Sequence, residues 1–548
     1  MHRTPGNVAA LVPALLLSAA SFAQQPAPGT ESPVLREGIR RAVEVKAMDL
    51  DVVATKNGQP VNDLKKEDFV VKVDGKQVPI DYFARVEAGA LHGPDLANAS
   101  PDVVLETLKD DRGDRFLARH FLVFFDDEHL LPFERNRVIE NMRDFVQRLT
   151  PSDRVSIVSY GATKRLIIPF TSSKEELLDG LSRLEKIAPG GVRWDNDYRR
   201  TVLDLQRTRG SSRQQLIRSW SQQAFVREKS TLDDLRRAVA ALAARSGKRI
   251  LVLVSDGLEL HPGQILSQTF GPFSLSQWDY SVTNDLSAVI AEANSAGVTV
   301  HAIDAKGLTS DSDAAESGPS PFNSFFVSQT LKEPLAEVSR QTGGTLLTNR
   351  NTFKAAFDRI YQDASSYYTI GVTLSNLDAR AKEHKVDVAT TRPGIEVRTR
   401  RTFTPKTADE ATRDRMEMAL LNPAARGDFP VAVAIGPPKK GGGLGHRLAP
   451  YEVRVPMSAL SFRDEGGKKT ATFEIALAAV KDNGERSGFR PDRKTVSIPE
   501  GEWEKAKGDA FRYTGEMKTG TGNFRFVATV RDVATDAVGL GTASVHID

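Results

Sequence analysis

The sequence of 548 residues contains no cysteine, so disulfides, thiolate metal sites and cysteine nucleophiles are excluded. It also lacks an excess of one charge: the formal net charge is +3, without the concentrated basic face expected of a nucleic-acid-binding protein. No apolar run reaches the ~20 residues that a membrane-spanning helix needs. A chain of this length is predicted to form several domains, each held together by its own hydrophobic core.

The sequence also lacks the short motifs of common enzymes. It has no G-x-S-x-G elbow, no His-Glu-x-x-His and no phosphate-binding loop. The Gly-rich run GPPKKGGGLGH (436–446) lacks the Gly-Lys-Ser/Thr ending and precedes no helix pattern, so we interpret it as a connection between strands. No catalytic residue is therefore assigned, and the chain is not predicted to be an enzyme.

The first 23 residues have the layout of a cleavable secretory signal peptide. A weakly positive start precedes a short apolar core, and small residues stand at both positions before a cut after Ala23. Residues 24–40 then form a Pro-rich polar leader. We therefore expect a bacterial protein that is secreted or periplasmic.

Two short segments, 41–88 and 366–404, alternate apolar and polar residues and are predicted to be antiparallel strands. Each is too small to bury a core alone, so we expect them to pair. Between them, residues 115–365 place apolar runs such as FLVFF and ILVLV between amphipathic helix patterns. This alternation predicts an α/β domain with a doubly wound, mostly parallel sheet of the Rossmann type.

The last part of the chain, 408–548, returns to β patterns. A short helix pattern (408–421) is followed by about seven short apolar runs separated by polar turns, which is typical of a β-sandwich. We therefore expect the α/β domain to be flanked by antiparallel β modules, with a C-terminal β-sandwich.

Ordered landmarks within residues 115–365 resemble a von Willebrand factor A (VWA) domain. The first apolar strand ends in Asp126, and Ser230-Thr231 is predicted to open a helix further along. VLVSDG ends a later strand at Asp256, AGVTVHAID resembles the next strand, and LAEVSRQTGG resembles the following helix with its Thr-Gly-Gly. The flanking runs VVKVDGK and YYTIGV resemble a bacterial secreted subgroup of VWA-related proteins.

The resemblance implies a metal-dependent adhesion site at the carboxyl ends of the strands. In the family, Asp-x-Ser-x-Ser, a Thr before a helix and the Asp of an Asp-Gly loop hold a divalent cation, to which a partner's carboxylate binds. The positions that match in this chain are Asp126, Glu128, Thr231 and Asp256. The implied ion is Mg²⁺, with Ca²⁺ or Mn²⁺ as alternatives.

Two departures make this site degenerate. Glu128 and Leu130 stand where the family has its two serines, and Leu130 has no ligand atom. A site with no metal is therefore an equally open interpretation. In that case Asp126, Glu128 and Asp256 would repel one another, and one of them would take up a proton through a raised pKa.

The same residues also have interpretations that need no ligand. Ser230 and Asp233 match a helix N-cap pair, and Asp256 with its glycine matches a turn after a strand. His129 is interpreted as a loop histidine, although shifting the site by one residue would offer Asp127 and His129 in place of the preferred Asp126.

Three insertions, 190–229, 258–285 and 306–328, interrupt the α/β pattern. The first is rich in Arg and Gln and shows helical spacing of apolar residues. The other two leave the carboxyl ends of strands and carry aromatic residues that we predict to bind a partner, unless they fill small cores of their own. These residues are Phe270, Phe273, Trp278, Tyr280, Phe322, Phe325 and Phe326.

Three functions follow from these patterns. The preferred hypothesis is a secreted or periplasmic protein-binding or adhesion protein that uses the face where the strands end. The alternatives are a metal-dependent hydrolase built on Asp126, Glu128 and Asp256, and a structural component of an envelope assembly without a ligand site. The sequence predicts a protein partner, no nucleic acid, and leaves the oligomeric state open.

Overall fold

The structure is a computed structural model. It describes residues 47–87, 90–92, 107–109, 115–161, 165–243, 245, 247–270, 280–306, 325–348, 353–373, 383–404, 412–413, 415–416, 419–420, 427–441, 446–482, 486–488, 491–535 and 537–548. The signal peptide and leader proposed for residues 1–40 lie outside these ranges. No helix in the described ranges is long and apolar enough to cross a membrane.

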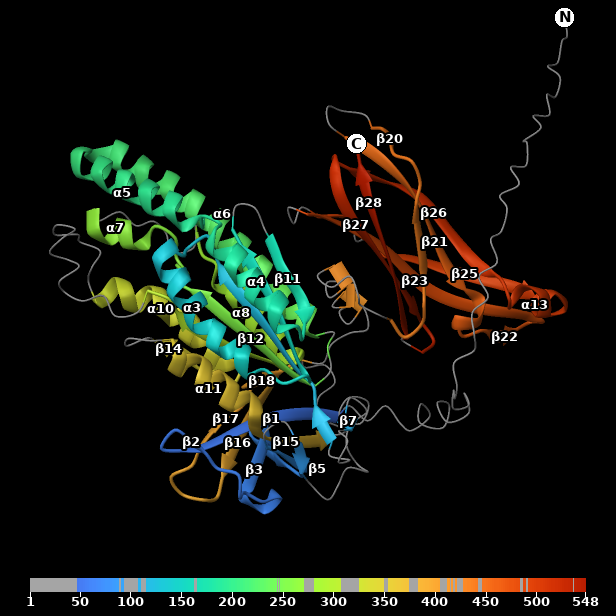
Figure 1. Cartoon of the computed structure of the whole chain (residues 1–548), viewed down its shortest axis with the longest axis horizontal. Coiled ribbons are helices and arrows are strands. Elements are labelled where there is room, and N and C mark those ends of the chain that lie inside the picture. The colour runs from blue at the N-terminus through green and yellow to red at the C-terminus, as the bar shows by residue number, and fades with distance from the viewer. Residues whose placement is uncertain are drawn as a thin grey trace, which may run out of the picture. The chain divides into compact units, whose positions relative to one another are not determined.

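The middle of the chain forms a central sheet with the strand order β11-β10-β9-β12-β13-β14 (Figure 1). Neighbouring strands run parallel except β10 and β11, which are antiparallel. The strands are β9 (Arg119–Asp126), β10 (Asp153–Tyr160), β11 (Arg165–Thr171), β12 (Lys248–Ser255), β13 (Val298–Asp304) and β14 (Leu346–Thr348).

Helices cover both faces of this sheet. One face packs against α3 (Pro132–Arg148), α4 (Lys174–Glu185) and α11 (Lys354–Ser365), and the other packs against α6 (Gly210–Ala243), α8 (Thr283–Ser295) and α10 (Phe325–Gln341). Successive side chains of β9 point to opposite faces, so Phe121, Val123 and Phe125 join the first core and Leu122 and Phe124 join the second. This two-sided burial is why the strand is apolar at every position.

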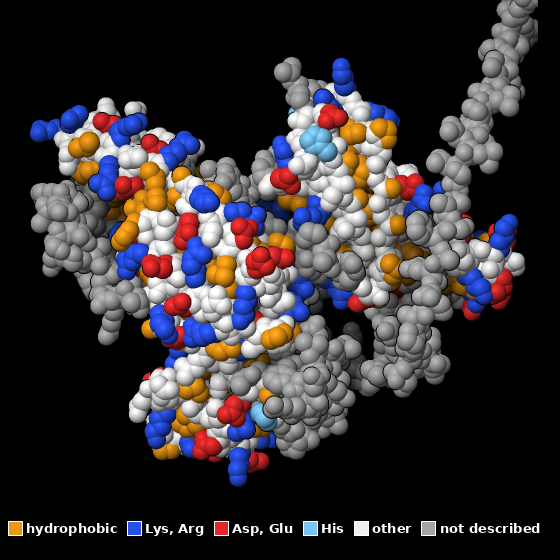
Figure 2. Space-filling model, in the orientation of Figure 1, with side chains coloured by type: hydrophobic (Ala, Val, Ile, Leu, Met, Phe, Trp, Pro, Cys, Tyr) orange, Lys and Arg blue, Asp and Glu red, His pale blue; other side chains and the backbone are white. Residues whose placement is uncertain are grey.

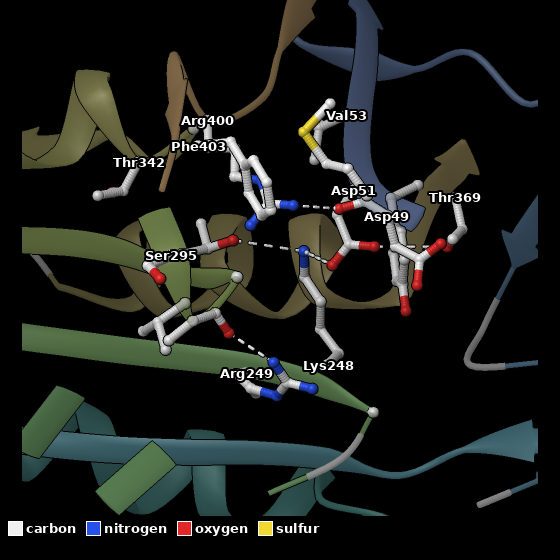
Figure 3. Close-up of a pocket in the computed structure, with 18 residues that line it drawn as sticks. Asp49, Asp51, Val53, Lys248, Arg249, Ser295, Thr342, Thr369, Arg400 and Phe403 are labelled. Atoms are coloured by element: carbon white, nitrogen blue, oxygen red, sulfur yellow. Dashed lines mark hydrogen bonds and ion pairs between the residues drawn. The ribbon is translucent and has the colours of Figure 1, made fainter. Parts of the chain in front are cut away.

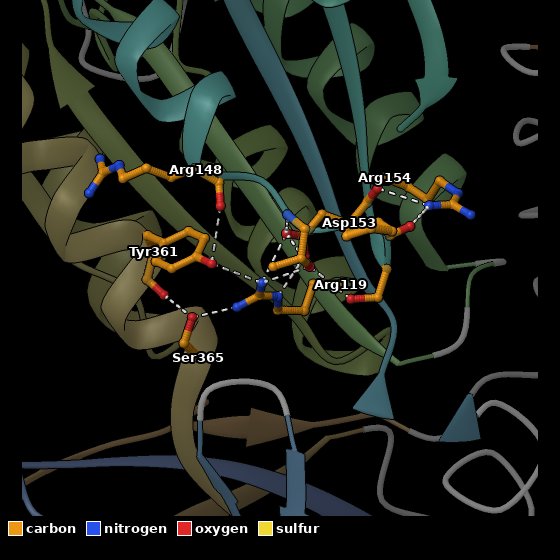
Figure 4. Close-up of polar contacts among 9 residues, drawn as sticks. Arg119, Arg148, Asp153, Arg154, Tyr361 and Ser365 are labelled. Carbon is orange, nitrogen blue, oxygen red and sulfur yellow. Dashed lines mark hydrogen bonds and ion pairs between the residues drawn. The ribbon is translucent and has the colours of Figure 1, made fainter. Parts of the chain in front are cut away.

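A buried ion pair fixes the amino-end edge of the sheet. The Arg119 guanidinium, at the start of β9, donates to both carboxylate oxygens of Asp153 at the start of β10, at 2.6 and 2.9 Å (Figure 4). It also donates to the Tyr361 hydroxyl at 3.3 Å and to the Ser365 hydroxyl, both on α11. One side chain therefore ties two strands and a covering helix together.

The strands before and after the central sheet pair with each other. β1 and β5 lie on either side of β15, and β3 pairs with β16, all antiparallel. These strands share one apolar core. The elements of this β module are β1 (Ala47–Lys56), β2 (Gln59–Pro60), η1 (Lys66–Asp68), β3 (Phe69–Val73), β4 (Lys76–Val78), β5 (Tyr82–Glu87), β6 (Ala90–His92), β7 (Thr107–Lys109), β8 (Arg115–Leu117), β15 (Ser366–Thr373), β16 (His384–Thr390), β17 (Glu396–Arg398) and β18 (Thr402–Phe403).

A helical arm, residues 191–227, extends from the central domain. It consists of α5 (Gly191–Arg207) and the first half of α6, with α7 (Gln264–Phe270) packed beside them (Figure 1). The arm has a small core of its own in which Trp194 and Trp220 lie against each other, with ring centroids 3.8 Å apart. Phe270 packs against this core.

The C-terminal region contains two antiparallel sheets around one core. β21 pairs with β19, β20 and β26, whereas β23 pairs with β22, β24, β25 and β27, and β27 pairs with β28. The elements are β19 (Ala432–Ile435), β20 (Lys439–Lys440), β21 (Arg447–Pro456), η3 (Met457–Ala459), β22 (Arg463–Glu465), β23 (Lys468–Lys481), β24 (Arg486–Gly488), β25 (Asp492–Pro499), α13 (Glu500–Ala506), β26 (Ala510–Thr519), β27 (Gly522–Asp532) and β28 (Val538–Ile547).

Two local expectations were wrong. Ser230 and Thr231 do not open a helix, because α6 begins at Gly210 and runs through both residues without a break. Ser230 and Asp233 are therefore not an N-cap pair. Similarly, α10 begins at Phe325, inside the insertion expected at 306–328. In both cases the helix pattern begins earlier than its apolar spacing suggested, because polar and small residues continue it.

Replacing Arg119 with lysine is expected to destabilise the protein. Lysine keeps the charge but cannot form the paired contacts to Asp153, so about 1–3 kcal/mol should be lost from the free energy of unfolding. Urea unfolding of the variant measures this loss. Arg154→Lys, on β10 beside Asp153, is the matched control because Arg154 donates only to backbone carbonyls of Pro151 and Asp153. Equal stability of the two variants would contradict the role given to Arg119.

Candidate functional site at the carboxyl ends of the strands

The carboxyl ends of β9, β12 and β13 bring acidic residues to one edge of the central sheet. β9 ends at Asp126, β12 ends at Ser255, and β13 ends at Asp304, which lies opposite Ser255. Asp126 and Asp304 are completely buried. In a doubly wound sheet this edge is where ligands bind, so the partners of these acids decide what the edge can do.

His129 joins two buried carboxylates. Its Nδ1 lies 2.7 Å from Asp126 Oδ2, and its Nε2 lies 2.9 Å from Glu228 Oε1. The Ser255 hydroxyl donates to the same Asp126 oxygen at 2.8 Å. The loop that follows β9 holds His129 in place, because the backbone amides of His129 and Leu130 donate to the Asp126 carbonyl.

These contacts favour the charged form of the histidine. Burial alone lowers the pKa of His129, but the negative charges of Asp126 and Glu228 outweigh it and raise the pKa to about 10. His129 is therefore an imidazolium at neutral pH, and both of its N–H groups donate to carboxylates. It supplies a positive charge from within the chain at the position where the resemblance implied a metal ion.

The neighbouring acid, Asp127, is also paired with a cationic side chain of the protein. Its Oδ2 accepts from Arg135 Nη1 at 3.0 Å and from the Ser159 hydroxyl at 2.5 Å. Arg135 is fully buried and lies on α3, while Ser159 lies on β10. Burial raises the pKa of Asp127 even though Arg135 opposes that shift. Asp127 thus ties α3 to the sheet.

Asp256 has a basic neighbour of its own, and the charge of His129 also lowers its pKa. Lys306 Nζ lies 3.7 Å from Asp256 Oδ2, and Lys332 Nζ lies 2.8 Å from Asp304 Oδ2. Burial raises the pKa of Asp256 to about 7, with Lys306 opposing the shift and Glu134 and Asp304 adding to it. The proton uptake that the sequence suggested for one of three acids therefore has its physical basis at this residue.

Glu128 lies beneath the start of the arm. Burial raises its pKa, and the charges of Arg227 and His129 oppose the shift. Arg227 stacks over the ring of Trp194 and lies 3.6 Å from Glu228. Glu128 is close to Gly190, where a Cβ would come within 3.4 Å of Glu128 Oε2. The arm is thus attached directly above the acidic edge.

The residues present do not fit a divalent cation. Asp126 Oδ2 already accepts two hydrogen bonds, which leaves only its buried Oδ1 without a partner. Leu130 is a buried part of the apolar core, and Thr231 lies inside helix α6. No group of three or more histidine or acidic residues in the described ranges is arranged to hold a metal. A cation placed beside Asp126 would also meet the positive charge of His129.

The structure describes four of the seven aromatic residues predicted to bind a partner. Phe270 packs in the core of the arm, and the Tyr280 ring lies 6.0 Å from that of Phe225. Phe325 and Phe326 begin α10. Phe273, Trp278 and Phe322 lie outside the described residues. For Phe270, the small-core alternative from the sequence is the one that its packing matches.

Other apolar side chains are exposed near the site. The large hydrophobic residues exposed in the described part of the chain are Phe133 (72%), Leu203 (50%), Val226 (62%) and Val192 (38%). Phe133 follows His129 by four residues and Val226 precedes Glu228 by two. Val192 follows Gly191, where a Cβ would meet the Leu130 carbonyl at 2.3 Å. Three of the four therefore lie close in sequence to residues that contact the acidic edge.

The arm adds a strong positive charge to this surface. Residues 191–227 contain eight arginines, three aspartates and no lysine. Arg200, Arg207, Arg209 and Arg218 are exposed and have no ion pair with any described residue. Figure 2 shows basic side chains and hydrophobic side chains intermixed on this projection, at the upper left.

Sheet order and landmarks together decide the fold of the central region. Asp126, the Ser-Asp-Gly at the end of β12 and the Gly-Gly between α10 and β14 all fall at connections of a doubly wound sheet with one antiparallel edge strand. We call the central region the VWA-like domain, after the resemblance of its sequence landmarks and the doubly wound sheet on which they lie. Antiparallel β structure flanks it on both sides in the sequence.

Comparison with known proteins found distant structural likenesses. No protein-family model and no curated protein matches the sequence. An aerotolerance-related membrane protein from Bacteroides fragilis is 14% identical over 45% of this chain and 98% of its own, with a TM-score of 0.24. The vWF domain of the type V pili tip protein Mfa5 from Porphyromonas gingivalis is 12% identical over 45% and 95%, with a TM-score of 0.24. Manganese-loaded TRAP protein from Plasmodium vivax is 10% identical over 70% and 94%, also with a TM-score of 0.24.

Sequence reasoning missed the cations that complete the site in the VWA-like domain. Glu228 is 99 residues from His129, and nothing local in the sequence links them. Lys306 and Lys332 follow β13 and belong to segments with no motif. The one contact that the sequence could have suggested is that of His129, because a histidine three residues after a buried aspartate can place its imidazole against that carboxylate.

His129→Gln is expected to lower stability in a way that depends on pH. Glutamine leaves Asp126 and Glu228 buried without a cation, at a cost of about 3–5 kcal/mol near pH 6. The pKa of His129 is about 10 when folded and 6.5 as a free side chain, so its contribution is complete below pH 6.5 and is lost as the pH rises through 10. Urea unfolding followed by fluorescence should show the two proteins converging at high pH.

The matched control for this experiment is His546→Gln. That side chain is 62% exposed in the C-terminal region, so its loss should change stability little and equally at each pH. A stability difference between wild type and His129→Gln that stays constant from pH 6 to pH 10 would show that His129 does not carry a charge in the folded protein.

Proposed function

We propose that this chain is an extracytoplasmic protein-binding protein whose VWA-like domain recognises its partner without a metal ion. The proposed binding surface is the top face, formed by the carboxyl ends of β9, β12 and β13 together with the arm (191–227). The observation that carries the proposal is the position of the exposed apolar residues. Phe133, Val192 and Val226 lie within a few residues in sequence of the segments that contact an acidic edge, and basic side chains of the chain pair with acids of that edge.

The internal cations change what the top face can offer a partner. A bound metal would present an open coordination position to a partner's carboxylate. Here the imidazolium of His129 is buried between Asp126 and Glu228, and both of its nitrogens are used. Recognition must therefore come from the surface around the acids, where Phe133 and the arginines are of residue types that are enriched in interfaces.

The arm gives the surface its chemical preference. Its exposed arginines favour carboxylate groups, which a guanidinium binds through two parallel hydrogen bonds. Its own tryptophan core keeps it ordered, so little conformational freedom is lost on binding. We therefore propose that the partner presents apolar and acidic side chains together. The distant structures include a pilus tip protein, which is consistent with an adhesive or structural role in a cell envelope.

The alternatives left by the sequence receive less support. A hydrolase built on Asp126, Glu128 and Asp256 needs carboxylates that are free to hold a metal, whereas Asp126 pairs with His129 and Asp256 lies beside Lys306. A purely structural role without a binding face does not account for Val226 and Phe133, which are 62% and 72% exposed. Mg²⁺, Ca²⁺ and Mn²⁺ are the ions to test, because the proposal predicts that partner binding needs none of them.

Site-specific photo-crosslinking in the native host tests this proposal. A photoreactive residue at Val226 should give one discrete protein adduct, and EDTA should not change its yield. The same residue at Lys505, which is exposed on α13 of the C-terminal region, should give no such adduct. Loss of the Val226 adduct in EDTA with recovery in Mg²⁺ would contradict metal independence, and no adduct at Val226 would contradict the binding surface.

Calorimetry provides a second, independent check of metal independence. Titration of the mature protein with Mg²⁺, Mn²⁺ or Ca²⁺ should show no saturable binding, and Asp126→Asn should behave in the same way. Saturable binding to wild type that Asp126→Asn abolishes would show that a cation can displace the contacts of His129.

A further inference from the structure

A pocket lies at the opposite edge of the central sheet, away from the top face. It has a volume of about 220 Å³, which is the space of several water molecules. Lys248 and Arg249 at the start of β12 and the end of α8 form one side of it. The strands β1 and β15, together with Arg400 and Phe403, form the other. The pocket therefore opens between the VWA-like domain and the β module.

Three cationic side chains line this pocket, as Figure 3 shows for Arg400, Lys248 and Arg249. Two carboxylates, from Asp49 and Asp51, also face it. Lys248 Nζ lies 2.8 Å from Asp51 Oδ2, so these two charges balance each other. The lining keeps a net positive charge, and that charge resides on the two arginines.

The arginines are held by backbone carbonyls and not by carboxylates. Arg249 Nη1 donates to the Ala296 carbonyl at 2.5 Å, and Arg400 Nη1 donates to the Asn294 carbonyl. Arg400 Nη2 donates to the Asp49 carbonyl at 2.5 Å. No described acidic side chain forms an ion pair with either guanidinium. The remaining N–H groups of the two guanidinium groups therefore do not donate to a described carboxylate.

Both guanidinium groups lie beside Gly297. Gly297 ends α8 with a φ of +61°, and a Cβ there would lie 3.6 Å from Arg249 Nη1 and 3.7 Å from Arg400 Nη1. Burial and the nearby charge of Arg249 lower the pKa of Arg400 to about 10, although Asp51 and Asp49 oppose this. The two arginines repel each other, and a bound anion would add to the attraction that Asp49 and Asp51 already supply.

The aromatic ring of Phe403 holds one of the arginines in position. Arg400 Cζ lies 5.2 Å from the centroid of that ring, within the range of a cation–π contact. Arg400 is only 9% exposed. Its planar group is therefore oriented before any ligand arrives, which is the condition under which a guanidinium binds an oxyanion tightly.

We propose that this pocket binds a small anion with a carboxylate or phosphate group through Arg249 and Arg400. The bound anion would join residues of the VWA-like domain to residues of the β module. It would thereby strengthen the attachment between them. The proposal is independent of the partner-binding function, because it uses the opposite edge of the sheet and none of the residues of the top face.

Calorimetric titration with inorganic phosphate and with acetate, at matched ionic strength in chloride, tests the proposal on the mature protein. Saturable binding of either anion is expected, together with a rise in Tm that depends on its concentration. A response to phosphate alone assigns the site to phosphorylated compounds, and a response to both assigns it to carboxylates as well. Absence of saturable binding of both anions would overturn the proposal.

Variants decide whether the anion occupies this pocket. Arg249→Gln should weaken binding at least ten-fold, whereas Arg463→Gln, which removes the same charge from an exposed position on β22, should bind like wild type. Arg249 is the primary variant because it is less buried than Arg400 and its loss disturbs fewer contacts. Equal affinity of wild type and Arg249→Gln would show that the anion binds elsewhere and would overturn the proposal.

Discussion

The charged contact between His129 and two buried carboxylates determines what the top face can do. Asp126 ends a strand in the middle of the sheet, and Glu228 lies within α6 on a segment far along the chain. Without a cation between them, two negative charges would face each other in a region from which water is excluded. His129 provides that cation from a loop that is itself folded around the Asp126 carbonyl. The contacts that join β9, the loop after it and α6 therefore depend on the protonated state of His129.

Charge balance from within the chain recurs throughout the domain. Four acids each form an ion pair with a basic side chain of the chain. The pairs are Asp127 with Arg135, Asp256 with Lys306, Asp304 with Lys332 and, at the other edge, Asp153 with Arg119. Four exposed arginines of the arm, and Arg249 and Arg400 in the pocket, have no ion pair with a described carboxylate. These are the positions where an external acidic group has something to bind, and they lie at opposite edges of the sheet.

Much of the fold could be read from patterns that depend on local physics. The run FLVFF is apolar at every position because both faces of β9 are covered, and this alone predicts a parallel sheet between helices. The thin cores of the flanking β segments likewise predict partners, and β1 lies beside β15. The start of α6 was misplaced because Ser230 and Thr231 have the composition of a cap but continue the helix. The preference of Ser230 and Thr231 for a helix N-cap is weak, and the packing of the first half of α6 in the arm decides where the helix begins.

The sequence by itself determined the class of fold, the position of the acidic edge and the absence of the family's two serines. These follow from apolar periodicity and from residues that stand next to each other in the chain. Only the tertiary structure decided that His129, Glu228, Arg135 and Lys306 neutralise that edge, and that Arg249 and Arg400 share a pocket. The reason is physical: a charge interacts through space, and the partners that balance it come from segments whose separation in the sequence holds no information about their distance.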